Sequence, residues 1–407
     1  MSYTELRELY YADSAEYAAA YPARYNSPYA HHIAFKIGEN PAFFILTPEM
    51  HETMMAIQKA DKRVFAICSK LPGKAIEQFT LRCLIDEITL TNNIEGVHST
   101  RREIDGILSA LGRTDRRLRF YGLVQKYVML QTKGDLPLKS CRDIRDIYDD
   151  LVHREVVEDN GENAPDGVLF RKGAVSVLSA TQKEIHRGLY PESAITAAME
   201  QALAYLNNEE EDLLLRAAVF HYLLGYIHPF YDGNGRLNRF ISSYLLSKEY
   251  EPVLGYRLSY TIRENISGYY SAFKKGNDPL NKGDLTPFVL MFLDIVKTSA
   301  LLLEEALSSR LKQLDHYTKH IHRLPDAQDN VCGALYDLLI QAELFSEHGI
   351  STVELLSYLR VSRGTLRTKL LRIDAAGFLK SEQVKHEKFY GIDLTKVDQF
   401  INTLSPA

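Results

Sequence analysis

The segment from His228 to Arg239 constrains this chain most, because it sets a glycine-containing loop between two stretches of helical apolar periodicity. The segment reads His-Pro-Phe-Tyr-Asp-Gly-Asn-Gly-Arg-Leu-Asn-Arg. Apolar residues recur at helical spacing over residues 213–227 before it and over 240–246 after it. The sequence therefore predicts a polar loop held between two core helices.

The two glycines of this loop indicate an anion-binding site. Gly233 and Gly235 allow successive backbone N–H groups to converge on one point. That point lies at the N-terminus of the following helix, where unpaired N–H groups and the helix dipole favour phosphate. Arg236 and Arg239 are one helical turn apart, so both can reach one polyphosphate.

Two further residues of the loop suit phosphate chemistry. Asp232 would be repelled by a phosphate unless a divalent cation lay between them, and one carboxylate with phosphate oxygens and water is how Mg²⁺ is usually held. His228 precedes the nest and can take a proton from an attacking hydroxyl. The alternative is a glycine-rich turn with a structural histidine and solvated arginines, which is improbable for so many suited residues in one loop.

The loop matches the Fic family signature HxFx(D/E)GNGRxxR at every defined position, and the resemblance extends from about residue 85 to 295. It implies an all-α core with a β-hairpin flap over the active site. It also implies that AMP moves from ATP to a Ser, Thr or Tyr hydroxyl of a target protein, with release of pyrophosphate.

The resemblance also implies a role for each loop residue. His228 resembles the general base, and Asp232 the ligand of Mg²⁺. Arg236 resembles the β-phosphate clamp, and Arg239 the γ-phosphate partner. The anion hole around the phosphates is implied for three residues: Gly233, Asn234 and Gly235.

The flap and the adenosine pocket follow from the same resemblance. The flap is expected between Val175 and Gly188, with residues 179–183 as an apparent insertion. His186 and Arg187 resemble the flap segment that contacts nucleotide, although His186 fits an exposed loop residue equally well. The adenosine pocket is implied for Tyr269, Tyr270, Asn277, Gly283 and Asp284, with one tyrosine in the core and the other facing the pocket.

A second motif lies upstream, in Thr91-Asn-Asn-Ile-Glu95-Gly96. Thr91 and Glu95 share one helix face, and Gly96 suits the residue after a helix end. An acid at a helix C-terminus is disfavoured by up to about 1 kcal/mol, which suggests a cationic partner. The motif resembles the Fic inhibitory motif (S/T)xxxE(G/N), which implies a Glu95–Arg239 pair that makes ATP bind unproductively. The alternative is a solvated glutamate.

The predicted fold is mainly α: a Fic-type helical bundle with a β-hairpin flap, plus a C-terminal winged helix-turn-helix domain. Only residues 168–178 and 379–392 read as strands. Three regions are expected: an N-terminal helical region over 1–84, a Fic core over 85–320, and the winged module over 328–407.

The winged module carries basic residues that suit phosphate contacts: Arg360, Arg363, Arg367, Lys369, Arg372 and Lys380. Acidic residues nearly balance them over the whole module. A DNA partner and a protein partner, including a homodimer contact, therefore both stay open.

Composition narrows the remaining classes. The net charge of −5 argues against a general nucleic-acid coat. The four cysteines are scattered, which argues against a disulfide framework or a structural zinc site. The N-terminus has no apolar signal segment, and no apolar stretch of about 18 residues is evident. We expect a cytoplasmic protein with no membrane contact.

Three functional alternatives accompany adenylyl transfer. The same pocket, with a water activated by Glu95, can remove AMP from a modified protein. Another pyrophosphate-linked nucleotide can serve as donor, because the anion hole reads phosphates more than the base. The chain can instead be a DNA-binding regulator whose Fic site senses nucleotide.

Overall fold

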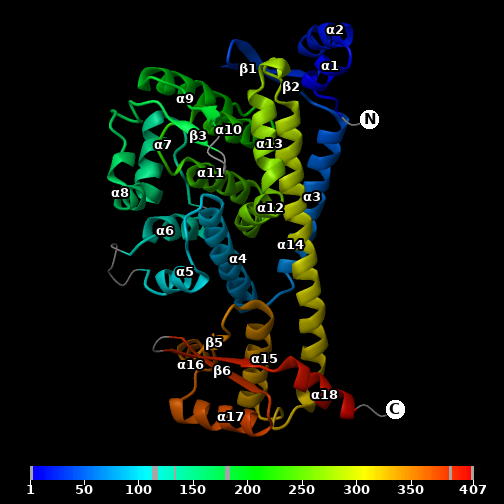
Figure 1. Ribbon diagram of the computed structural model, residues 1–407. Helices are drawn as coiled ribbons and strands as arrows, with labels where there is room; N and C mark the ends of the chain where they lie inside the picture. The colour runs from blue at the N-terminus through cyan, green and yellow to red at the C-terminus, as the bar shows by residue number, and fades with distance from the viewer. Residues whose placement is uncertain (1–2, 112–117, 133, 179–183, 385–386, 405–407) are drawn as a thin grey trace. The chain divides into compact units, whose positions relative to one another are not determined.

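The computed structural model describes residues 3–111, 118–132, 134–178, 184–384 and 387–404, and it is mainly helical (Figure 1). Residues Met1–Asp61 and Leu84–Leu301 form one compact unit, and Lys62–Cys83 and Leu302–Ala407 form a second. This grouping differs from the division expected from the sequence, which places boundaries near residues 84 and 328. The expected domain boundaries stay a prediction.

In chain order, the elements as far as the long helix α14 are α1 (Leu6–Ala12), α2 (Ser14–Tyr25), β1 (Ala30–Ile37), β2 (Asn40–Ile45), α3 (Pro48–Cys68), α4 (Gly73–Ile94), α5 (Arg101–Leu108), α6 (Tyr121–Met129), α7 (Cys141–Tyr148), α8 (Arg154–Asp159), β3 (Ser176–Leu178), β4 (Glu184–Arg187), α9 (Glu192–Leu206), α10 (Leu213–Ile227), α11 (Asn234–Glu249), α12 (Leu258–Glu264), α13 (Ile266–Asn277) and α14 (Thr286–His320). Short helical turns join several of them: η1 (Leu130–Thr132), η2 (Asp149–His153), η3 (Gly161–Asn163), η4 (Pro252–Arg257) and η5 (Pro279–Asn281).

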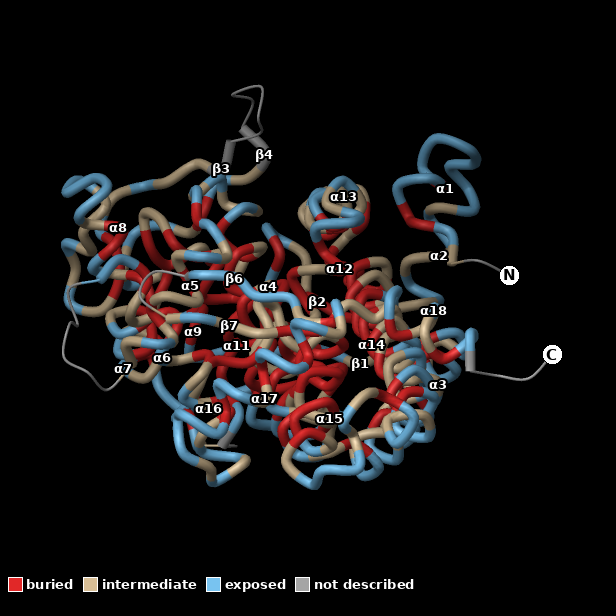
Figure 2. Tube along the Cα trace, turned by 90° about the horizontal axis from the view of Figure 1, so that it is seen from below, coloured by how far each residue is buried: buried red, intermediate tan, exposed pale blue. Residues whose placement is uncertain are grey.

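Helices α10 and α11 form the centre of the first unit. α10 starts at the N-cap Asp212, whose carboxylate accepts a hydrogen bond from the backbone N–H of Leu214 at 2.8 Å. Its side chains are apolar nearly all round, which is typical of a helix buried on every side. α11 is buried from Arg236 to Ser247, and its trace is red along most of its length in Figure 2. The two core helices predicted around the loop are therefore present.

Helix α14 differs from the sequence analysis in one respect. An 18-residue window in the helical stretch that begins at Thr286 has a mean hydropathy of 1.7, so by length and composition it could cross a membrane. The sequence analysis had expected no such stretch. Within this structure 56% of the window is buried, as for the core helix of a folded domain.

Two hairpins lie in the first unit. β1 pairs with β2 antiparallel, and the sequence analysis missed this hairpin by expecting only helix before residue 84. β3 pairs with β4 antiparallel, with Val177 opposite His186, inside the region predicted for the flap. The strand predicted over 168–178 is confirmed only for Ser176–Leu178. The apparent insertion at 179–183 lies outside the described residues.

The C-terminal part of the second unit follows a short turn, η6 (Ile321–Arg323). Its elements are α15 (Asn330–Phe345), β5 (Ile350–Ser351), α16 (Thr352–Leu359), α17 (Arg363–Ala375), β6 (Leu379–Val384), β7 (Glu387–Ile392) and α18 (Leu394–Leu404). Ser351 and Glu354 form a capping box that starts α16, and Ser362 caps α17. The predicted order of helix, turn, helix and strand pair is present, and β5 adds a third strand in the order β5-β7-β6.

Candidate active site

The loop between α10 and α11 is held by its own side chains. α10 ends at His228, which has a positive φ of 52°, an uncommon value outside glycine. The amide of Asn234 bridges the loop, since its Oδ1 accepts from the Phe230 N–H at 3.0 Å and its Nδ2 donates to the Phe230 carbonyl at 2.8 Å. Phe230 is fully buried and stacks on Tyr148 with ring centroids 3.6 Å apart. The side chain of Asn234 therefore shapes the loop.

A cavity of about 720 Å³ opens beside this loop. Residues from α4, α10, α11, α13 and the flap line it. They include Glu95, His186, His228, Asn234, Gly235, Arg239, Tyr269, Tyr270, Lys274 and Asn277. Residues predicted from distant parts of the sequence thus share one cavity of nucleotide size.

His228 is suited to accept a proton. Burial, followed by the charges of His186 and Arg171, lowers its pKa to about 4, while the charge of Glu95 acts in the opposite direction. The imidazole is therefore neutral at physiological pH. A neutral imidazole at the cavity wall is the form that a general base requires.

Arg171 supports this position, and the sequence analysis missed it. Its guanidinium is fully buried and donates to the carbonyl of His228 at 2.9 Å and to that of Leu189 at 2.8 Å. A third hydrogen bond goes to the carbonyl of Gly173. Arg171 thus ties the base of the flap to the loop, and an arginine inside the apolar run Val-Leu-Phe-Arg was the available signal.

Arg239 and Glu95 form the pair that the sequence analysis predicted. Arg239 Nη2 lies 2.8 Å from Glu95 Oε1. Arg239 also donates from Nε to Thr91 Oγ1 at 2.7 Å and from Nη2 to the Thr91 carbonyl at 3.0 Å. Burial alone would lower the pKa of this guanidinium, but the charge of Glu95 outweighs it and the pKa is raised. The last turn of α4 therefore occupies the guanidinium of Arg239.

The carboxylate of Glu95 also lies against Gly235 of the predicted anion nest. A Cβ placed on Gly235 would lie 2.1 Å from Glu95 Oε1 and 2.5 Å from Glu95 Cδ. Only glycine leaves room for a carboxylate this close to the backbone at the N-terminus of α11. A negatively charged group therefore lies beside the place predicted for phosphate oxygens.

Arg236 is not among the residues that line the cavity, although the sequence predicts it at the nucleotide site. It is buried and forms an ion pair with Glu155 of α8, and it does not line the cavity. Burial raises the pKa of Glu155, and the positive charge of Arg236 opposes that rise. Residues three apart on a helix differ in direction by about 60°, which sends Arg236 to α8 and Arg239 to α4. Its assignment as a β-phosphate clamp stays a prediction.

Of Asp232, His186 and Arg187, only His186 is among the residues that line the cavity. Asp232 is half-buried, and its carboxylate accepts from the N–H of Gly233 at 2.5 Å. A single carboxylate beside an anion nest fits a Mg²⁺ that takes its other ligands from phosphate and water. His186 Nε2 lies 2.6 Å from the carbonyl of Tyr226, so this nitrogen carries a proton, and Arg187 is exposed.

Helix α13 forms the wall predicted for adenosine. Tyr269 is buried, and its hydroxyl lies 2.7 Å from His221 Nε2, whereas Tyr270 is 37% exposed. Asn277 Oδ1 accepts a hydrogen bond from the Tyr222 hydroxyl at 2.7 Å. His221, which the sequence analysis did not single out, is buried, and burial followed by the charge of Arg239 lowers its pKa to about 3.

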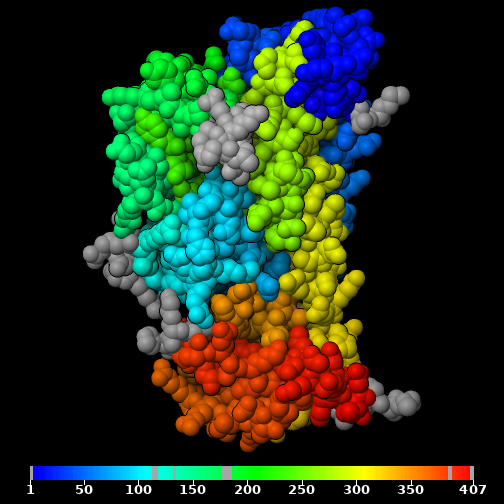
Figure 3. Space-filling model, in the orientation of Figure 1, coloured from blue at the N-terminus to red at the C-terminus, as the bar shows by residue number. Residues whose placement is uncertain are grey.

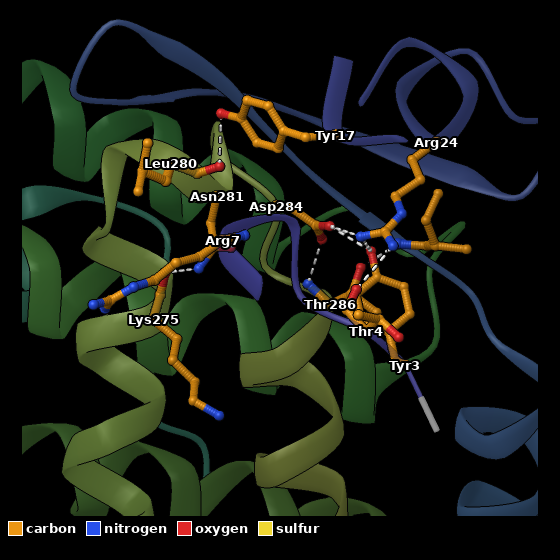
Figure 4. A network of polar contacts seen from close by, with 11 residues as sticks. Tyr3, Thr4, Arg7, Tyr17, Arg24, Lys275, Leu280, Asn281, Asp284 and Thr286 are labelled. Carbon is orange, nitrogen blue, oxygen red and sulfur yellow. Dashed lines mark hydrogen bonds and ion pairs between the residues drawn. The ribbon is translucent and has the colours of Figure 1, made fainter. Parts of the chain in front are cut away.

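Asp284 also differs from expectation in its position. It was expected to close the adenosine pocket with Gly283, but neither residue lines the cavity. Asp284 instead binds Tyr3 and Arg24 of the N-terminal segment (Figure 4).

Glu87 is a buried carboxylate one helical turn behind Thr91 on α4. It is fully buried and accepts from the N–H of Ser259 at 2.8 Å and from the Ser259 hydroxyl at 2.5 Å. Burial raises its pKa to about 7, although the Ser259 hydrogen bonds and the charges of Arg239 and Arg257 oppose this rise. Its ionisation therefore costs folding free energy.

This position predicts how Glu87→Gln changes the pH dependence of stability. The pKa of Glu87 is raised from 4.5 to about 7 on folding, which corresponds to about 3 kcal/mol. That contribution is present below pH 4.5 and is lost as the pH rises through 7. Between pH 5 and 8, the free energy of unfolding of the parent should fall by about 3 kcal/mol relative to Glu87→Gln in urea titrations. A constant difference between the two proteins would show that Glu87 does not titrate in this range.

One loop between two buried helices carries both a neutral imidazole and a predicted anion nest that contains glycine. This combination is typical of a site that binds phosphate and transfers it. Residues 140–246 match the Fic/DOC family. The chain therefore contains a Fic domain.

Similar proteins agree with this assignment. The chain is 36% identical over 100 residues to proteins described as protein adenylyltransferase Fic in Drosophila grimshawi and Drosophila melanogaster. These residues are 24% of this chain and 19% and 18% of those proteins, so the chain spans about a fifth of their length. A crystal structure of a Fic family protein from Desulfovibrio desulfuricans G20 shares the fold, with a TM-score of 0.52 and 21% identity over 86% of this chain and 97% of that one.

Proposed function

We propose that this chain is a protein adenylyltransferase that moves AMP from ATP to a protein hydroxyl, and that Glu95 inhibits it. The observation that carries the proposal is that His228, Gly235 and Arg239 line one cavity, in which the carboxylate of Glu95 lies against Gly235 and pairs with Arg239. The relatives named as adenylyltransferases support ATP as the donor.

The chemistry follows from the positions of these groups. The hydroxyl oxygen of the target attacks the α-phosphorus of ATP, and its proton passes to the neutral imidazole of His228. The new bond joins oxygen to the α-phosphorus, while the bond from the α-phosphorus to the bridging oxygen breaks and pyrophosphate leaves. The N–H groups at the start of α11 stabilise the charge on the phosphate oxygens. Mg²⁺ beside Asp232 would supply charge neutralisation of the diphosphate.

Inhibition follows from competition for one position. A triphosphate that reaches the nest and Arg239 must first displace the Glu95 carboxylate. Because the carboxylate and phosphate are both anions, the two cannot occupy the nest together. We therefore interpret the Glu95–Arg239 arrangement as the inhibited form of the protein.

The proposal is tested by incubating the Glu95→Gly protein with labelled ATP and Mg²⁺, followed by mass mapping of the modified residue. Label on a Ser, Thr or Tyr hydroxyl supports the proposal. Transfer from CTP or UTP in preference to ATP would show that the nucleotide donor is not ATP. Loss of AMP from a previously modified protein, without forward transfer, would favour the reverse reaction.

We further propose that α16 and α17 form part of a winged helix that binds DNA through phosphate contacts. Between Glu354 and Asp374 the chain carries five basic residues and no acid. Lys369 and Arg372 pair with Asp329 and Asp326. The other three are exposed and form no ion pair within the described part of the chain: Arg360, Arg363 and Arg367.

A salt titration tests this second proposal. Binding of a random-sequence duplex should weaken linearly with the logarithm of salt concentration, with a slope of about −0.9 for each phosphate contact. Arg363→Ala combined with Arg367→Ala should reduce that slope by about 2, whereas Lys369→Ala, whose ammonium is already paired, should leave it nearly unchanged. Absence of duplex binding at 50 mM salt, or binding that is insensitive to salt, would contradict DNA binding and favour a protein partner for the surface of α16 and α17.

A further inference from the structure

The N-terminal segment Tyr3–Tyr25 lies against the connector between α13 and α14. In Figure 3 the dark blue N-terminal residues lie beside the yellow-green residues of α13, and the polar contacts agree with this view. The Tyr17 hydroxyl donates to the carbonyl of Leu280 at 3.1 Å, and Lys282 Nζ lies 4.7 Å from the ring centroids of Tyr17 and Tyr21. Leu6 and Leu9 are buried. The contact therefore combines apolar and polar groups.

Asp284 is the centre of the polar part of this contact (Figure 4). Its carboxylate accepts a hydrogen bond from the Tyr3 hydroxyl and lies 3.5 Å from Arg24 Nη1. Arg24 also donates to the Tyr3 hydroxyl at 3.0 Å and to the carbonyl of Thr4 at 2.8 Å. Asp284 is only 2% exposed. A buried carboxylate with this many donors fixes the connector strongly, because losing one partner of a buried pair leaves the other charge uncompensated.

A second set of contacts reaches the end of α13 itself. Arg7 Nη1 lies 2.9 Å from Asp278 Oδ2, and the backbone N–H of Arg7 donates to Asn281 Oδ1 at 2.9 Å. Glu5 pairs with Lys275 in the last turn of α13. Asn281 Nδ2 donates to the Lys275 carbonyl at 2.7 Å, so the same asparagine joins the N-terminal segment to the helix end.

The opposite side of the connector is held by the β1–β2 hairpin. The N–H of Phe43 donates to the carbonyl of Gly283 at 3.1 Å, and the N–H of Leu285 donates to the carbonyl of Phe43 at 2.7 Å. The connector is therefore fixed between the hairpin and the N-terminal segment. Its position determines where α13 ends.

Helix α13 supplies one wall of the cavity, with Tyr270, Lys274 and Asn277 facing it. The anion nest and Arg239 belong to α11, on which the N-terminal segment makes no polar contact among the described residues. A shift of α13 would therefore move the wall proposed for the nucleoside and leave the phosphate site in place.

We propose that Tyr3–Tyr25 is a clasp that positions the α13 wall for the nucleoside part of the nucleotide. The inference rests on the proposed function and assigns Tyr3, Arg24 and Asp284 as positioning residues for nucleoside binding. The clasp sets affinity for the base and ribose, and the loop between α10 and α11 sets affinity for the phosphates.

The test compares two ligands in the Glu95→Gly protein, because inorganic tripolyphosphate has the phosphates of ATP without its nucleoside. Asp284→Asn should weaken ATP binding about 10-fold, through a shift of the α13 wall, and change tripolyphosphate binding less than about 2-fold. KM for ATP should rise by the same factor, with kcat at saturation unchanged within about 2-fold. The control is Asp294→Asn, since that exposed carboxylate on α14 pairs only locally with Lys297.

Arg7→Ala provides a milder variant if Asp284→Asn fails to fold, since the Arg7 side chain is 48% exposed. It should raise KM for ATP about 3-fold and leave tripolyphosphate binding unchanged. Equal weakening of both ligands, or no weakening of either, would overturn the clasp. If the Glu95→Gly parent itself binds no ATP, the proposed function fails and the clasp fails with it. A parent that binds ATP, with clasp variants that bind it equally well, overturns the clasp alone.

Discussion

Glu95→Gly is expected to raise the rate of AMP transfer about 10- to 100-fold and to tighten ATP binding. The substitution removes the carboxylate that lies against Gly235 and frees Arg239, whose charged hydrogen bond with Glu95 spans 2.8 Å. A hydrogen bond to a charged group is worth about 1.5–3 kcal/mol. If Glu95 blocks most molecules, the apparent affinity for ATP is the intrinsic affinity multiplied by the small fraction of protein that is not blocked. Initial rates with labelled ATP, and calorimetric ATP affinities, measure the two effects.

Two further variants separate displacement of the carboxylate from loosening of the helix. Asn93→Gly places a glycine at an exposed position on the same last turn of α4, so it carries a similar helix-propensity cost without touching the nest. It should leave transfer near the parent rate. Glu95→Gln keeps the bulk and removes the charge, and it should give an intermediate rate. Equal activation by Asn93→Gly would show that the helix end, and not the carboxylate, controls the site.

His228→Ala in the Glu95→Gly protein is expected to lower kcat about 10²- to 10⁴-fold, the range for loss of a general base. ATP affinity should change little, because the imidazole acts on the incoming hydroxyl and the phosphates bind at α11. Single-turnover transfer with labelled ATP measures the first effect, and calorimetry the second. A parallel loss of ATP binding would mean that His228 shapes the pocket and does not carry the proton.

The loop and the segment Thr91–Gly96 were predictable because each is a local pattern with a fixed geometry. The pattern of residues 228–239 predicts a turn, the start of a helix and the positions of the charges. Thr91 and Glu95 lie one helical turn apart. The Glu95–Arg239 pair required the family resemblance, since nothing local joins two residues so far apart in the chain. The structure contains that pair at 2.8 Å.

The residues that differ from expectation have partners that only the fold supplies. Arg236 and Arg239 look alike in sequence, but Glu155 lies beside the first and Glu95 beside the second. The family resemblance places Asp284 at the adenosine pocket, but in the structure its carboxylate contacts Tyr3 and Arg24. Both cases depend on a contact across the chain that periodicity and spacing do not encode.

The missed β1 strand is different, because its signal was present. Along Ala30–Ile37 the apolar residues Ile33, Phe35 and Ile37 alternate with polar or small ones, and these three are the buried positions. Alternation of this kind is typical of a strand with one buried face. The sequence indicates the roles of Arg171 and His221 only weakly. A polar residue inside an apolar run shows that it needs a buried hydrogen-bond partner, but it does not identify that partner.

The central claim is that Glu95 and a nucleotide phosphate compete for one nest beside the base His228. Intact-mass analysis after incubation with ATP and Mg²⁺ tests it most directly, using Glu95→Gly and the double variant Glu95→Gly/His228→Ala. The account predicts that Glu95→Gly gains the mass of AMP and that the double variant does not. An equal gain in both proteins, or no gain in either, would contradict it.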